Sequence, residues 1–130
     1  MKWKRIAGAC MAGCVLGMPL VADAYEGDWK RGHVYYRMVC TSCHVVKAGG
    51  SIGPNARTQA EWAAYMQANK HAKGKDSVSY YVSKPYRESI ASTNKAAAKF
   101  ADVPEQELFE DLKAFVSRSA KDGDAPTGCR

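Results

Sequence analysis

The sequence predicts a small all-α fold of three to four short helices joined by long connections. Residues 58–61 form a capping box, in which Thr58 and Glu61 each satisfy a backbone N–H of the other at the start of a helix. Residues 45–57 are rich in glycine and contain Gly53-Pro54, so they should form a loop. Near the C-terminus an apolar stripe recurs at helical spacing, at Leu108, Leu112, Phe115 and Val116.

The first helix is expected to begin at Asp28, whose carboxylate can accept hydrogen bonds from the first free backbone N–H groups. Gly32, Tyr36 and Cys40 follow at four-residue spacing, which places them on one face of the helix. We expect this helix to run to about Cys43.

Two helices are expected in the middle of the chain. The first starts at the capping box and ends before Gly74. Its apolar side includes Trp62, Tyr65 and Met66. Residues 76–83 should form a short helix that stops before Pro85, because the residue before a proline avoids helical geometry. Residues 84–101 have no clear assignment.

The last helix is expected to have Asp102 as its N-cap and Glu105 in its first turn, where negative charge is favoured. It should end near Gly123. The ordered core is therefore expected to span about residues 27–121, followed by a loose tail over 122–130.

The first 24 residues have the pattern of a secretory signal peptide. Basic residues open the chain, Ile6–Val21 is apolar and uncharged, and Ala22-Asp23-Ala24 has the small-x-small form of a cleavage site. A retained membrane anchor and a lipoprotein modified at Cys14 are the alternatives, although the apolar run is short and interrupted by glycine and proline. The mature domain would then be residues 25–130, in the periplasm or outside the cell.

The charge of the chain limits the class of partner. Removing residues 1–24 takes away three basic residues and one acidic residue, so the formal net charge falls from +6 to +4. A modest positive charge favours an acidic protein surface or an anionic membrane. Because no run of Lys and Arg with interleaved aromatic residues is present, nucleic-acid binding is not expected.

The strongest chemical signal is Cys40-Thr41-Ser42-Cys43-His44, which has the C-x-x-C-H form of an attachment site for c-type haem. Each thiol adds across one haem vinyl group, and the two intervening residues match the spacing of the sulfurs to that of the vinyls. The histidine then lies under the iron and supplies a neutral imidazole nitrogen. A haem would also fill the centre of a chain that short helices alone could hardly fill. The sequence thus predicts one covalent haem, with His44 as the proximal iron ligand.

Three other interpretations of the C-x-x-C spacing stay open. A thioredoxin-like redox motif needs a βαβ context, and none is visible. Half of a zinc site would need a further thiol, and Cys129 lies far away in the sequence. A disulfide between Cys40 and Cys43 would close a tight and strained loop.

The chain around this motif resembles the class I cytochromes c. That family has a glycine eight residues before the first haem cysteine and an aromatic residue four before it, and Gly32 and Tyr36 occupy these positions. Gly53-Pro54-Asn55 resembles the Gly-Pro loop of the family. Glu110–Phe115 resembles its C-terminal helix.

The resemblance implies two roles outside the motif. The carbonyl of Pro54 would accept a hydrogen bond from the imidazole of His44, which fixes the tautomer of that ligand. Leu112 and Phe115 would pack against Gly32, whose lack of a side chain permits the close approach.

The family pattern fails where the distal methionine is expected. Residues 93–101 contain no methionine, and Ala98 falls close to its usual position. His71 is the first candidate for the sixth ligand and Met66 the second. If the helix is continuous over both, the two side chains point in different directions, so at most one should face the iron. The weaker alternatives are Lys95, Lys99, His33 and an open site.

A narrower resemblance is to single-haem cytochromes of bacteria that respire with metals or sulfur compounds. They share a Thr-Gln-x-x-Trp stretch, a Lys-His pair and a short tail ending near a cysteine. Thr58–Trp62, Lys70-His71 and Ala125–Cys129 match these three features. The match favours His71 as the distal ligand.

The resemblance implies a carrier that passes single electrons between periplasmic or membrane redox proteins. The alternative is a haem enzyme, or a sensor of gases or peroxide, with an open or weakly ligated sixth position and His71 or Arg87 as distal donors. A third hypothesis is a subunit joined to a partner or a second copy by a disulfide at Cys129, although that residue could equally be an inert thiol. Aromatic residues expected in the haem pocket and core are Trp29, Trp62, Tyr80, Tyr81 and Tyr86.

Overall fold

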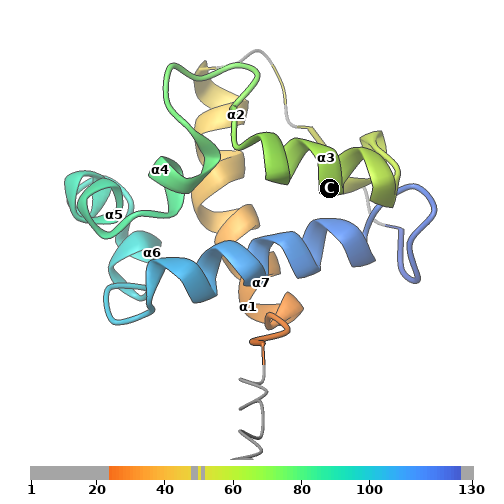
Figure 1. The fold of residues 1–130 in the computed structure, drawn as a ribbon. Helices are drawn as coiled ribbons and strands as arrows, with labels where there is room; N and C mark the ends of the chain where they lie inside the picture. The colour runs from red at the N-terminus through yellow and green to blue at the C-terminus, as the bar shows by residue number, and fades with distance from the viewer. Residues whose placement is uncertain (1–23, 48–49, 51, 127–130) are drawn as a thin grey trace, which may run out of the picture.

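The computed structural model describes residues 24–47, 50 and 52–126. Over these ranges the chain is all-α and contains no strand, which confirms the expected class (Figure 1). The helices are shorter and more numerous than the three to four expected. In chain order they are α1 (Trp29–Tyr35), the π-helix η1 (Tyr36–Cys40), α2 (Thr41–Lys47), the 3₁₀-helix η2 (Pro54–Ala56), α3 (Gln59–Ala68), α4 (Val78–Val82), α5 (Lys84–Ile90), α6 (Lys95–Ala98) and α7 (Glu105–Arg118).

Helix α7 is the centre of the arrangement (Figure 1). It crosses the segment formed by α1, η1 and α2, and it also packs against α3 and α4. Helices α4, α5 and α6 gather at one end of α7, and α3 runs along the other. The core where these helices meet includes Tyr35, Val39, Trp62, Met66, Val82, Leu108, Leu112, Phe115 and Val116.

The first helical segment is longer than expected. The carboxylate of Asp28 caps it by accepting from the backbone N–H groups of Lys30 and Arg31, as expected. The segment continues through a π-helical turn at η1 and runs through α2 to Lys47, beyond the expected end at Cys43. Such π turns are uncommon and often occur at functional sites. Here the turn leads directly into the Cys-x-x-Cys-His segment.

The crossing of α1 and α7 depends on a glycine. Gly32 is buried, and a Cβ atom at this position would overlap the backbone carbonyl of Asp111. Phe115 lies on the same face of α7, where its ring stacks on His33 at a centroid distance of 4.8 Å and contacts Tyr36 at 5.4 Å. The structure therefore confirms that Gly32 permits close packing against the last helix.

A buried carboxylate fastens the N-terminal segment to α7. Asp111 is fully buried and accepts from the hydroxyl of Tyr25 at 2.5 Å and from the backbone N–H of Asp28 at 2.6 Å. Its other oxygen accepts from the guanidinium of Arg31, which also pairs with Glu107 at 3.1 Å. The charge of Asp111 is thus paired and hydrogen-bonded, as a buried charge must be.

Two expected boundaries of the last helix are wrong. Pro104, not Asp102, is the N-cap, and no side chain caps this end. The chain turns through Asp102 and Val103 before the proline starts the helix, and Glu105 and Glu107 supply negative charge in the first turn. The helix ends at Arg118 rather than near Gly123. The apolar stripe from Leu108 to Val116 is buried as expected.

The region without a sequence assignment contains α5 and α6. Ser83 caps α5, and Pro85 lies in its first turn, where the missing N–H of proline does no harm. On α5 the side chain of Arg87 is 1% exposed, and it donates to the carbonyls of Ser83, Phe100 and Val103. This one cation therefore ties α5 to the connection that leads into α7.

Several expectations concern residues at the two ends of the chain. Residues 1–23 of the expected signal peptide, and Cys129, lie outside the described residues. Part of the expected tail is bonded to the fold, because Asp122 accepts from the backbone N–H of Gln59 at 2.7 Å. In the part of the chain that is described, no helix is long and apolar enough to cross a membrane.

Candidate functional site

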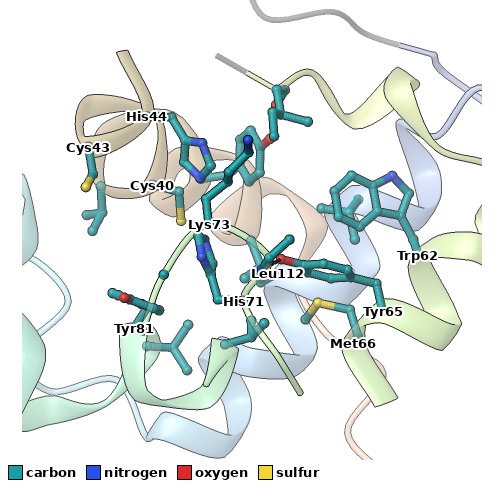
Figure 2. A pocket seen from close by; sticks show the side chains of 18 of the residues that line it. Cys40, Cys43, His44, Trp62, Tyr65, Met66, His71, Lys73, Tyr81 and Leu112 are labelled. Atoms are coloured by element: carbon teal, nitrogen blue, oxygen red, sulfur yellow. Dashed lines mark hydrogen bonds between the residues drawn. The ribbon is translucent and has the colours of Figure 1, made fainter. Parts of the chain in front are cut away.

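The candidate site is a cavity of about 520 Å³ between the helices (Figure 2). One wall comes from η1 and α2, the opposite wall from α3, and α7 contributes Leu112 and Val116. The loop from α3 to α4 and the following helix complete the enclosure. The lining is mainly apolar and aromatic, and the volume lies in the usual range of about 300–1,000 Å³ for small-molecule and cofactor pockets.

Cys40, Cys43 and His44 all line this cavity. They lie on consecutive turns of a continuous helical segment, where residues three and four apart share a face. The two intervening hydroxyls are engaged with the helix itself, since Thr41 donates to the carbonyl of Tyr36 at 3.0 Å and Ser42 donates to that of Val39 at 2.8 Å. The local helix is thus what presents the motif to the cavity.

The two cysteines differ in their surroundings. Cys40 is half-buried and packs against the core, whereas Cys43 is exposed, and the two are free thiols rather than a disulfide. Burial raises the pKa of the Cys40 thiol to about 12, so this residue is a protonated thiol near neutral pH. No group of three or more His, Cys, Asp or Glu side chains among the described residues is placed to hold a metal ion.

His71 lies opposite His44 across the cavity. It belongs to the loop that follows α3, and its ring centroid is 5.5 Å from that of His44, with the ring planes inclined by 50°. Burial lowers the pKa of His71, and the nearby His44 lowers it further, which favours the neutral imidazole that a metal requires. The Nδ1 atoms of both rings are buried without a hydrogen-bond partner. A buried polar atom without a partner calls for an explanation, and a group bound in the cavity is one.

The other candidates for a sixth ligand are placed differently. Met66 lines the cavity too, but from α3 beside Trp62 and Tyr65, and it is 3% exposed in the core.

His33 is exposed and stacks on Phe115 outside the cavity. Lys95 and Lys99 are exposed and do not line the cavity, and neither does any other residue of 93–101. The region that replaces the usual distal methionine therefore takes no part in this site.

The hydrogen bond expected from His44 to the carbonyl of Pro54 is absent. The indole N–H of Trp62 donates to that carbonyl instead, at 2.6 Å, and Nδ1 of His44 has no partner. The reason lies in α3: its capping box at Thr58 starts the helix immediately after the Gly-Pro turn, and Trp62 is one turn further along. Pro54 is buried but does not line the cavity.

Three cationic side chains of the site were missed by sequence reasoning. Arg57 lines the cavity, with its guanidinium 5.5 Å from the ring centroid of Trp62 and 4.9 Å from that of Tyr65. Lys73 and Lys75, on the loop that carries His71, also line it and are exposed. Single basic residues in a loop have no distinctive spacing, so no pattern pointed to them.

The aromatic residues expected in the pocket divide into two groups. Trp62, Tyr81 and Tyr86 line the cavity, as expected. Tyr80 and Trp29 do not: they are 41% and 37% exposed.

Arg87, considered as a distal donor, lies outside the cavity with all its bonds directed to backbone carbonyls.

No known protein-family model matches the chain, and no solved structure matches it. Its fold and its site nevertheless define a class over the described residues. It is a small all-α protein in which two cysteines and two histidines share one largely apolar cavity.

Proposed function

We propose that this chain is an exported class I c-type cytochrome that carries single electrons. One haem is attached through Cys40 and Cys43, with His44 as the proximal iron ligand and His71 as the distal ligand. The observation that carries the proposal is the position of the two imidazole rings. Their centroids are 5.5 Å apart in a cavity that both cysteines also line.

The residues of the cavity fit such a group. A bound haem iron supplies a one-electron redox couple, tuned by its axial ligands and surroundings. The thiols of Cys40 and Cys43 would hold the group through thioether bonds, and His44 and His71 would bind its iron as neutral imidazoles. Apolar walls, among them Val82 and Leu112, exclude water from its faces. The chain needs no acid or base catalyst for this role.

The class I assignment is supported by two features of the fold. The helix that carries the Cys-x-x-Cys-His motif crosses the last helix at Gly32, the position at which the family has its conserved spacing to the motif. The stripe of α7 that includes Leu112 lines the cavity from this crossing. The departure from the family is the distal ligand, which we assign to the loop after α3.

The position of His71 favours an electron carrier over a haem enzyme or sensor. Those functions need an open sixth position, and a histidine so close to His44 would close it. The basic side chains of Lys73 and Lys75 at the cavity edge would favour brief docking of redox partners with acidic surfaces. We place the protein in the periplasm, on the sequence pattern of residues 1–24.

Covalent attachment is the first prediction of this proposal. The protein expressed from the full sequence and exported should carry one haem that survives denaturation. The double variant Cys40→Ala/Cys43→Ala should carry none. Intact mass and a haem-stained denaturing gel are the measurements. Cys129→Ala, which removes a thiol outside the motif, is the matched control and should keep its haem. Loss of attachment in the control, or a wild-type protein without covalent haem, would refute the proposal.

Ligation by His71 is the second prediction. The wild-type protein should be low-spin, with a near-infrared spectrum that indicates nitrogen rather than sulfur ligation. His71→Ala should become high-spin and bind carbon monoxide on mixing, and added imidazole should restore the low-spin spectrum. Met66→Leu, which conserves apolar volume, should leave the spectrum unchanged. A sulfur signature lost in Met66→Leu would transfer the role to Met66, and a wild-type protein that binds carbon monoxide at once would favour the enzyme or sensor.

A further inference from the structure

The loop that carries His71 is closed at its base by reciprocal hydrogen bonds. Asn69, the C-cap of α3, has a left-handed backbone conformation with φ of 51°. Its side-chain amide donates to the hydroxyl of Ser79 at 2.8 Å, and its carbonyl oxygen accepts from the backbone N–H of Ser79 at 2.8 Å. These bonds join the end of α3 to α4 and fix both ends of the loop.

Two further contacts hold the backbone on either side of the histidine. The backbone N–H of Ala72 donates to the hydroxyl of Tyr65 at 3.0 Å. The backbone N–H of Gly74 donates to the carbonyl of His71 at 3.4 Å, which turns the loop back on itself. The backbone of His71 is thus held from α3 and from within the loop.

The side chain of His71 lies beside both Tyr81 and Gly74. The ring centroids of His71 and Tyr81 are 4.9 Å apart, and Figure 2 shows both side chains on the same side of the cavity. Tyr81 is held in turn by its backbone carbonyl, which accepts from the buried hydroxyl of Tyr35 at 2.5 Å. A Cβ atom on Gly74 would lie 2.7 Å from Nδ1 of His71 and would also overlap the hydroxyl of Tyr81.

We propose that Gly74 and Tyr81 are positioning residues that hold His71 in its orientation toward His44. This inference rests on the proposed function, in which His71 is the distal ligand. Gly74 leaves the space next to Nδ1 and the hydroxyl of Tyr81 free, and the ring of Tyr81 contacts the imidazole. The backbone conformation at Gly74 is an ordinary one, so the requirement for glycine is set by space rather than by backbone strain.

The experiment compares Gly74→Ala and Tyr81→Leu with the wild-type haem protein. A methyl group at residue 74 must displace the imidazole or the tyrosine, and a displaced side chain leaves its preferred rotamer. We expect carbon monoxide to bind to the reduced variants about tenfold faster than to the wild type, together with a high-spin fraction in the oxidised spectrum. Val34→Leu, at an exposed position of α1 that does not line the cavity, is the control and should behave as wild type.

A double variant separates positioning from a general loss of structure. In the His71→Ala background, Gly74→Ala should cause no further change in the carbon monoxide rate, because the side chain that it displaces is gone. A wild-type rate and spectrum in Gly74→Ala, in a protein where His71→Ala opens the site, would overturn this inference alone. Failure of His71→Ala to open the site would instead overturn the distal assignment. An equal effect of Gly74→Ala with and without His71 would show a structural role and reject positioning.

Discussion

Gly32→Val should lower the free energy of unfolding by about 3 kcal/mol, at the upper end of the usual cost of overpacking a core. A Cβ atom at this position would overlap the carbonyl of Asp111, and backbone cannot move aside as a flexible side chain can. The two helices would have to separate, which would disturb the buried contacts of Phe115 and the hydrogen bonds to Asp111. Urea unfolding followed by far-ultraviolet circular dichroism measures the change.

The control for Gly32→Val is a valine at an exposed helical position. Ala63 lies on the exposed side of α3, and Ala63→Val should cost only the difference in helix propensity, below about 1 kcal/mol. Gly32→Ala should fall between the two, because its single methyl group already meets the carbonyl. Equal stability of Gly32→Val and the wild type would contradict the close crossing of α1 and α7.

Arg87→Leu is the second change expected to have a large effect, with a loss of about 3 kcal/mol or more. The guanidinium donates to three backbone carbonyls, and each hydrogen bond that involves a charged group contributes about 1.5–3 kcal/mol. The carbonyls of Ser83 and Phe100 keep a backbone N–H donor, so the loss comes from the three charged hydrogen bonds and not from carbonyls left without any partner. Leucine has a similar apolar stem but restores none of these bonds. The loss should appear as a lower midpoint of urea unfolding with an unchanged slope.

Two further substitutions make the interpretation of Arg87→Leu specific. Arg37→Leu makes the same replacement at an exposed position of η1 and should change stability by less than about 0.5 kcal/mol. Arg87→Lys keeps the charge, but an ammonium group cannot match the planar arrangement of guanidinium donors, so its stability should be intermediate. If Arg87→Leu were as stable as Arg37→Leu, the three carbonyl contacts would have no energetic importance.

The contacts of Arg87 also bear on the site. Its bonds to Phe100 and Val103 hold α5 against the connection to α7, and α5 directly follows the helix that carries Tyr81. Tyr86, on α5, lines the cavity itself. Arg87→Leu should therefore disturb the packing of the cavity wall as well as that of the core.

Features that depend on neighbouring residues were predictable from the sequence alone. The capping box of Thr58 and Glu61 and the cap at Asp28 are formed as expected, because each joins groups within one turn of helix. The burial of the stripe on α7 follows from its helical period. The presentation of Cys40, Cys43 and His44 to one space is also local, since a helix places residues three and four apart on one face.

Only the tertiary structure decided which distant groups meet. His71 and Met66 were both candidates, and the path of the loop after α3 places the ring of His71 beside that of His44. The carbonyl of Pro54 could accept a hydrogen bond from His44 or from Trp62. The position of α3 places the indole N–H of Trp62 within hydrogen-bond distance of it. Arg87 is a charged residue with no sequence signal for burial, yet the carbonyls around it come from three separate positions of the chain. Such contacts depend on how helices pack, and the spacing of residues within one helix indicates which face is buried but not which groups of other segments it meets.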